Sequence, residues 1–178
     1  MVLAQWTDAT EWLAAAAQDP QICKRDWEHG SDSVHLLPTG RLWDVLIVPT
    51  CLGLRAADLL GEISDVKTGP ILLDDRRQRA GLFLPVGSGL ARAHCAVRYL
   101  STGGWIAAPA PLCRWGNLRW LTPPDVAGVL NSPTAVQTAL HQAAEDLVCA
   151  HYSARIDDDT SAPRRDCSQQ TIVHSSAA

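Results

Sequence analysis

Two adjacent carboxylates, Asp74 and Asp75, follow an apolar run and are succeeded by three arginines, Arg76, Arg77 and Arg79. Carboxylates at the end of a buried strand suit a divalent cation, because the strand fixes their direction while the loop leaves them open. Arginines suit phosphate groups, which a guanidinium binds in bidentate fashion. A solvated turn at a hairpin tip has the same composition, so both interpretations stay open.

A second group combines tryptophan with arginine: Trp105, Trp115 and Trp120 are interleaved with Arg114 and Arg119. Indoles stack on bases, and guanidinium groups contact phosphates. The chain has seven Trp but only one Phe and two Tyr, so the tryptophans must also supply much of the aromatic core. The predicted nucleic-acid contacts are Arg76, Arg77, Arg79, Arg114, Trp115 and Arg119, with core packing of the indoles as the alternative.

A glycine-containing stretch, residues 85–89, leads into a predicted helix and could offer backbone N–H groups to a phosphate. It lacks GKS, GKT and GxGxxG, so a plain strand-to-helix turn explains it as well. Cysteine and histidine show no paired spacing of the kind that tetrahedral zinc sites use, and GxSxG is absent. From these cysteines, histidines and serines we predict no metal ligands and no catalytic nucleophile.

The overall charge gives the chain no general attraction for phosphate backbones. Its 178 residues include 15 basic and 19 acidic side chains, for a formal charge of -4. Any contact with nucleic acid must therefore be local. The six cysteines are scattered, which favours reduced thiols, and neither a signal peptide nor an apolar run of about 20 residues is present. These features predict a cytoplasmic protein that makes no membrane contact.

The first half of the chain predicts helices and then strands. Asp8 and Glu11 form a capping box for a first helix, and Asp19 with Pro20 begins a second that ends at Gly30. The runs SVHLL and LWDVLIVP are strand-like and flank a turn, so they could form a hairpin. Residues 53–62 predict a helix.

The second half alternates strands and helices. PILLD and GLFLPV predict two strands paired across the polar segment DDRRQR. Residues 89–100 predict a helix, and GGWIAAP and LRWLTPP predict further strands. Ser132 and Pro133 begin a last helix that is expected to end near Tyr152.

This order predicts an α/β (α+β) fold with a mixed β-sheet flanked by helices. We expect a single domain over residues 1–152. Residues 153–178 are rich in Asp, Ser and Gln and are expected to form a disordered tail.

Three segments together resemble the N-terminal prim-pol domain of bifunctional DNA primase/polymerases: LLPTGRLWDVLIVPTCLG, DDRRQRAGLFLPVGSG and GGWIAAPAPLCRWGNLRWLTPP. The resemblance spans about residues 34–124. Where that family has an Asp-x-Asp metal motif, this chain has Ile47, Val48 and Pro49, with Asp44 upstream. The resemblance implies a degenerate, actinobacterial-type member that has lost its first metal carboxylates.

The function expected from this resemblance is a primase/polymerase-like role in replication or mobile-element biology, through binding of DNA or a replication protein. Two alternatives stay open. One is a small regulatory or scaffolding protein that acts by oligomerisation. The other is an active nucleotidyltransferase that needs Mg or Mn, for which the weak catalytic candidates are Asp44, Asp74 and Asp75.

Overall fold

A six-stranded antiparallel sheet forms the centre of the domain. The computed structural model describes residues 9–30, 33–63, 67–89, 97–125 and 127–160, with side chains up to residue 150. The strand order is β5-β2-β4-β3-β8-β7. The strands, in chain order, are β2 (Asp44–Pro49), β3 (Ile71–Asp74), β4 (Arg79–Leu84), β5 (Arg98–Leu100), β7 (Arg114–Trp115) and β8 (Leu118–Thr122).

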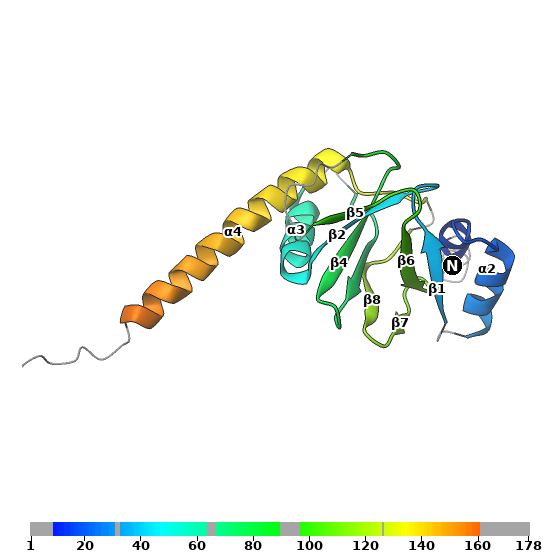
Figure 1. Ribbon diagram of the computed structural model, residues 1–178, viewed down its shortest axis with the longest axis horizontal. Coiled ribbons are helices and arrows are strands. Elements are labelled where there is room, and N and C mark those ends of the chain that lie inside the picture. The colour runs from blue at the N-terminus through cyan, green and yellow to red at the C-terminus, as the bar shows by residue number, and fades with distance from the viewer. Residues whose placement is uncertain (1–8, 31–32, 64–66, 90–96, 126, 161–178) are drawn as a thin grey trace, which may run out of the picture.

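A second, two-stranded sheet consists of β1 (Val34–Pro38) and β6 (Trp105–Pro109). It lies on one side of the large sheet together with α2 (Pro20–His29), whereas α3 (Thr50–Glu62) and α4 (Pro133–Thr160) lie on the other side (Figure 1). The α+β class is confirmed. The expected mixed sheet is replaced by two sheets in which every strand pair of the described residues is antiparallel.

The large sheet is covered on both faces, which explains why its central strands are apolar runs rather than alternating ones. In β2, Val45 packs into the core shared with α2 and the two-stranded sheet. Its neighbours Leu46 and Val48 pack into the core shared with α3 and α4. The two cores lie on opposite sides of the sheet, as the alternation of side chains along a strand requires.

Several predicted elements are confirmed. The carboxylate of Asp19 accepts a hydrogen bond from the Ile22 N–H at the start of α2. The segment DDRRQR joins β3 and β4, which pair as predicted. Residues 9–14 are helical, although Asp8 lies outside the described residues.

Three predictions are wrong. β1 and β2 do not form a hairpin, because β1 pairs with β6, with Leu37 opposite Ile106. Residues 98–100, expected in a helix, form β5 beside β2, and residues 90–96 lie outside the described part of the chain. The last helix runs to Thr160 instead of ending near Tyr152, since no Gly or Pro interrupts it before Pro163.

An ion pair fixes α4 to α3. The Asp146 carboxylate accepts hydrogen bonds from Arg55 Nε at 2.8 Å and from Gln142 Nε2 at 3.0 Å, and Arg55 Nη2 lies 2.7 Å away. The Gln142 hydrogen bond, then the Arg55 hydrogen bond, lowers the pKa of Asp146 below its ordinary 3.8. A carboxyl group with a lowered pKa in the folded state stabilises the fold above its unfolded pKa.

We therefore expect Asp146→Asn to lower the free energy of unfolding slightly at pH 7. The loss is small because exposed ion pairs contribute little. The difference from the wild type should shrink as the pH falls below 3.8 and through the lower pKa of the folded state. Urea unfolding at several pH values checks this, with Glu145→Gln on the same helix as the control. A difference that does not change with pH contradicts it.

Candidate nucleic-acid interface

The predicted carboxylates do not converge on one site. In β2, Asp44 is opposite Leu84 at the end of β4, whereas Asp74 is opposite Arg79 at the start of β4. Asp44 therefore lies at one end of the sheet, and Asp74 and Asp75 lie at the other. Among the described residues, no group of three or more His, Cys, Asp and Glu side chains could hold a metal ion.

Asp44 has a local structural role. It is fully buried, and its Oδ2 accepts hydrogen bonds from the Gly87 N–H at 2.8 Å and from the Tyr99 hydroxyl at 2.6 Å. The Gly87 N–H, which the sequence made a candidate phosphate donor, is thus directed at a carboxylate of the same chain. Burial, then the Asp44 hydrogen bond, raises the pKa of Tyr99 above its ordinary value.

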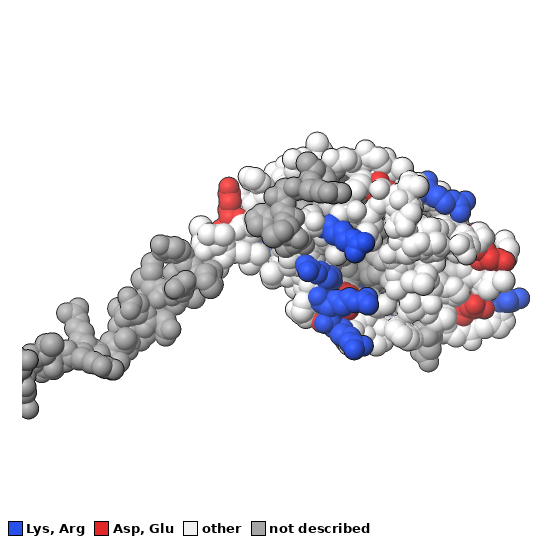
Figure 2. Space-filling model, in the orientation of Figure 1, with Lys and Arg blue, Asp and Glu red and all other residues white. Residues whose placement is uncertain are grey.

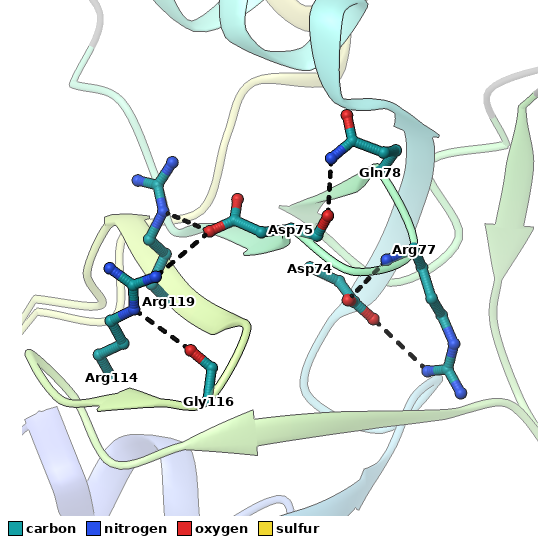
Figure 3. A network of polar contacts seen from close by, with 7 residues as sticks. All are labelled: Asp74, Asp75, Arg77, Gln78, Arg114, Gly116 and Arg119. Atoms are coloured by element: carbon teal, nitrogen blue, oxygen red, sulfur yellow. Dashed lines mark hydrogen bonds and ion pairs between the residues drawn. The ribbon is translucent and has the colours of Figure 1, made fainter.

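Asp74 organises the β3–β4 turn. Its Oδ1 accepts a hydrogen bond from the Arg77 backbone N–H at 3.0 Å, and its Oδ2 lies 3.5 Å from Arg77 Nη1 (Figure 3). Gln78, in a left-handed conformation with φ of 52°, donates from its side chain to the Asp75 carbonyl at 2.6 Å. These local bonds hold the arginine-bearing turn in a defined shape.

The Asp75 carboxylate contacts two of the arginines that were predicted to bind phosphates. Its Oδ2 accepts a hydrogen bond from Arg119 Nε at 3.0 Å and lies 3.8 Å from Arg114 Nη2 (Figure 3). Arg119 is opposite Leu73 in β3, and Leu73 packs toward α3 and α4. Arg114 and Arg119 therefore lie on the face of the sheet that α3 and α4 cover. Their positive charge is partly offset by Asp75.

The opposite face of the sheet carries an open hollow of about 170 Å3. Its floor includes Ile47, Leu72 and Gly81 from three neighbouring strands of the large sheet. A wall is formed by β6 of the small sheet, through Trp105, Ile106 and Ala107, and further lining comes from Leu100, Leu118, Asp74, Arg77 and Arg79. The hollow thus lies between the two sheets, at the end of the large sheet where β3 meets its arginine-bearing turn.

Two rows of paired residues show what surrounds the hollow, because directly opposed residues in antiparallel strands share a face. In one row, Arg79 is opposite Asp74, Asp74 is opposite Leu118, and Leu118 is opposite Trp115. Trp115, which is 46% exposed, therefore lies on the hollow's face of the sheet. Trp105, which lines the hollow, is exposed to the same extent.

The next row adds an arginine that sequence reasoning missed. Leu72 is opposite Gly81, Gly81 is opposite Ile47, and Ile47 is opposite Arg98 in β5. Arg98 is exposed and shares the hollow's face. The sequence pattern that indicates this strand is the alternation of apolar and polar side chains at Val97, Arg98 and Tyr99. These residues were instead included in the helix predicted over residues 89–100.

Positive charge is concentrated around this end of the sheet. The six arginines are Arg76, Arg77, Arg79, Arg98, Arg114 and Arg119, and against them stand two carboxylates, Asp74 and Asp75. On the hollow's face itself, Arg77, Arg79 and Arg98 stand against one carboxylate, Asp74, which gives a formal charge of three minus one, or +2, in a chain whose total is -4. Figure 2 shows basic side chains gathered in a row beside a hollowed part of the surface.

Of the three tryptophans in this region, one packs in the core and two lie at the surface. Trp120 packs against Phe83 with ring centroids 5.5 Å apart and donates from its indole N–H to the Pro109 and Ala110 carbonyls. Trp115 and Trp105 are instead accessible. Only these two of the three indoles are therefore available to a ligand.

Comparison with protein-family models, with curated proteins and with solved structures finds no match to this chain. In the described residues, no helix is both long and apolar enough to cross a membrane.

Proposed function

We propose that this domain binds single-stranded nucleic acid across the sheet face that carries the hollow. The observation that carries the proposal is the combination, on one face, of Arg77, Arg79 and Arg98 with the exposed indoles of Trp105 and Trp115. Basic grooves that follow a phosphate backbone, with aromatic rings on which bases stack, are the usual means of binding unpaired strands. Stacking on exposed indoles favours unpaired bases over a duplex.

The arginines have different parts in this proposal. Arg76, Arg77 and Arg79 are exposed on the turn and contact phosphates, and Arg98 extends this contact across the sheet. Arg114 and Arg119, held by Asp75, mainly fix the turn against β7 and β8 and contribute less to binding. Because the chain as a whole is acidic, binding depends on this local patch.

A binding titration tests the proposal. Fluorescence anisotropy of a labelled thymidine oligonucleotide of about 16 nucleotides, near the upper site size of one small domain, should show binding at low salt. With about three or four phosphates neutralised, the slope of log K against log salt should be about -2 to -3. A duplex of equal length should bind more weakly. The proposal fails if the protein does not bind the single strand at low salt.

We do not extend the proposal to nucleotidyl transfer. Two-metal catalysis needs carboxylates that hold both ions about 4 Å apart. Asp44 is separated from Asp74 and Asp75 by the length of the strands, and the carboxylates of Asp74 and Asp75 are engaged by Arg77 and Arg119. The context of replication or mobile elements is proposed only on the resemblance of three segments to prim-pol domains.

Assembly through α4 is the second candidate. The helix packs against the domain through Val136, Ala139 and Ala143 and then continues away from it (Figure 1). Val148, beyond this stripe, is 66% exposed. Isolated helical segments are marginal in water, so the projecting half would be stabilised by a partner. Sedimentation in the low-salt binding buffer separates the two functions: a stable oligomer without affinity for DNA favours assembly.

A further inference from the structure

The hollow is too small for a whole nucleotide but suits a single ring system. Its volume of about 170 Å3 is below the roughly 300 to 1,000 Å3 of typical small-molecule sites. We propose that the hollow receives one unstacked base of the bound strand. This inference rests on the proposed function and adds to it a pocket that holds a base, whereas Arg76, Arg77 and Arg79 hold the phosphates.

Gly81 lies on the floor of the hollow, at a point where the two sheets pack closely. It lies in the middle of β4, where glycine is unfavourable unless something approaches the backbone closely. A Cβ at this position would lie 3.1 Å from Val45 Cγ1, 3.3 Å from Ile47 Cδ1 and 3.4 Å from Ile106 Cδ1. A larger side chain here would therefore press against these three side chains and reduce the space between the two sheets that we assign to the base.

The lining matches the chemistry of a base. The floor and walls are mostly apolar, and Trp105 supplies an indole on which a flat ring can stack. Asp74, the one carboxylate among the lining residues, can accept a hydrogen bond from the N–H groups that every base carries on its pairing edge. Arg77 and Arg79 also line the hollow, where they can hold the phosphates on either side of the inserted base.

The test compares two labelled oligonucleotides of equal length, one of thymidines and one of abasic residues that keeps only the sugar-phosphate backbone. Gly81→Leu should lower the affinity for the thymidine oligonucleotide about 10-fold, since stacking of one base is lost. It should leave the affinity for the abasic oligonucleotide unchanged, because the arginines are intact. Gly61→Leu, at an α3 position where an added Cβ meets nothing within 4 Å, should change neither affinity.

If Gly81→Leu does not fold, a second pair of variants tests the base pocket. Trp105→Ala should lower the thymidine affinity selectively, and Trp105→Phe should retain most of it because a ring remains. Thymidine binding that is unchanged in Gly81→Leu and in Trp105→Ala overturns the base pocket and leaves the arginine interface standing. Failure of the wild type to bind either oligonucleotide overturns the proposed function itself, and the pocket with it.

Discussion

Replacement of Arg76, Arg77 and Arg79 by alanine is expected to lower the affinity for single-stranded DNA about 100-fold at low salt. All three side chains are exposed on the β3–β4 turn, and Arg77 and Arg79 line the hollow. An exposed ion pair contributes up to about 1 kcal/mol, so three phosphate contacts amount to about 3 kcal/mol. Since 1.4 kcal/mol corresponds to a factor of ten in affinity, the affinity should fall by about two orders of magnitude.

The salt dependence gives a second readout of the same variant. Each lost phosphate contact should reduce the magnitude of the slope of log K against log salt by about 0.7, hence by about 2 in total. Anisotropy titrations over a range of salt concentrations measure both quantities. The matched control removes the same number of positive charges elsewhere, through Arg25→Ala, Arg41→Ala and Lys67→Ala, in α2, the β1–β2 turn and the segment before β3. Equal losses in the two triple variants contradict a local interface.

Arg119→Ala tests whether Arg119 contacts phosphates or mainly positions the turn. The measured quantity is the affinity for single-stranded DNA. The Arg119 guanidinium is hydrogen-bonded to Asp75 on the face that α3 and α4 cover, so its removal should affect affinity less than the loss of Arg77 or Arg79 does.

The largest expected effect on stability comes from Asn131. Its side chain is buried and fully hydrogen-bonded: Oδ1 accepts from the Gly69 N–H at 2.9 Å, and Nδ2 donates to the Pro70 carbonyl at 3.1 Å and to the Phe83 carbonyl at 2.9 Å. Asn131 thereby connects the segment before α4 to the start of β3 and the end of β4. These bonds hold together two of the strands that form the floor of the hollow.

We expect Asn131→Leu to lower the free energy of unfolding by about 3 kcal/mol. It leaves the Gly69 N–H without its acceptor, and an unsatisfied buried group costs about 1 to 3 kcal/mol. It also removes one of two donors from the Pro70 and Phe83 carbonyls, which keep their backbone hydrogen bonds, and each lost bond contributes about 1 kcal/mol. That is a large part of a typical total stability of about 5 to 15 kcal/mol. Urea unfolding measures it, with the exposed Asn117→Leu as the control. A loss below about 1 kcal/mol contradicts the structural role assigned to Asn131.

The elements that could be predicted from the sequence are those fixed by local chemistry. The cap of α2 follows from Asp19 and Pro20, and the β3–β4 pairing follows from a polar segment between two apolar runs. The start of α4 follows from Pro133, whose fixed φ suits the first turn. In each case the deciding residues lie within a few positions of the element.

The predictions are wrong where contacts between segments distant in the sequence determine the structure. β5 exists because Arg98, Tyr99 and Leu100 pair with the edge of β2, and this contact overrides their local helical appearance. β1 turns away from β2 because β6 offers it a partner. The site was predictable only in part. The sequence indicated Trp115 and five of the six arginines, but neither Arg98 nor the hollow that Gly81 and Trp105 line between the two sheets.

The most direct test of the proposed interface is an NMR titration of the indole N–H signals with the thymidine oligonucleotide. The signals of Trp105 and Trp115, both 46% exposed on or beside the hollow, should shift as the strand binds, whereas that of the fully buried Trp43 should not. This result would place unpaired bases against the predicted indoles. If the signals of Trp105 and Trp115 do not shift at saturating oligonucleotide, the strand does not bind at the sheet face that carries the hollow.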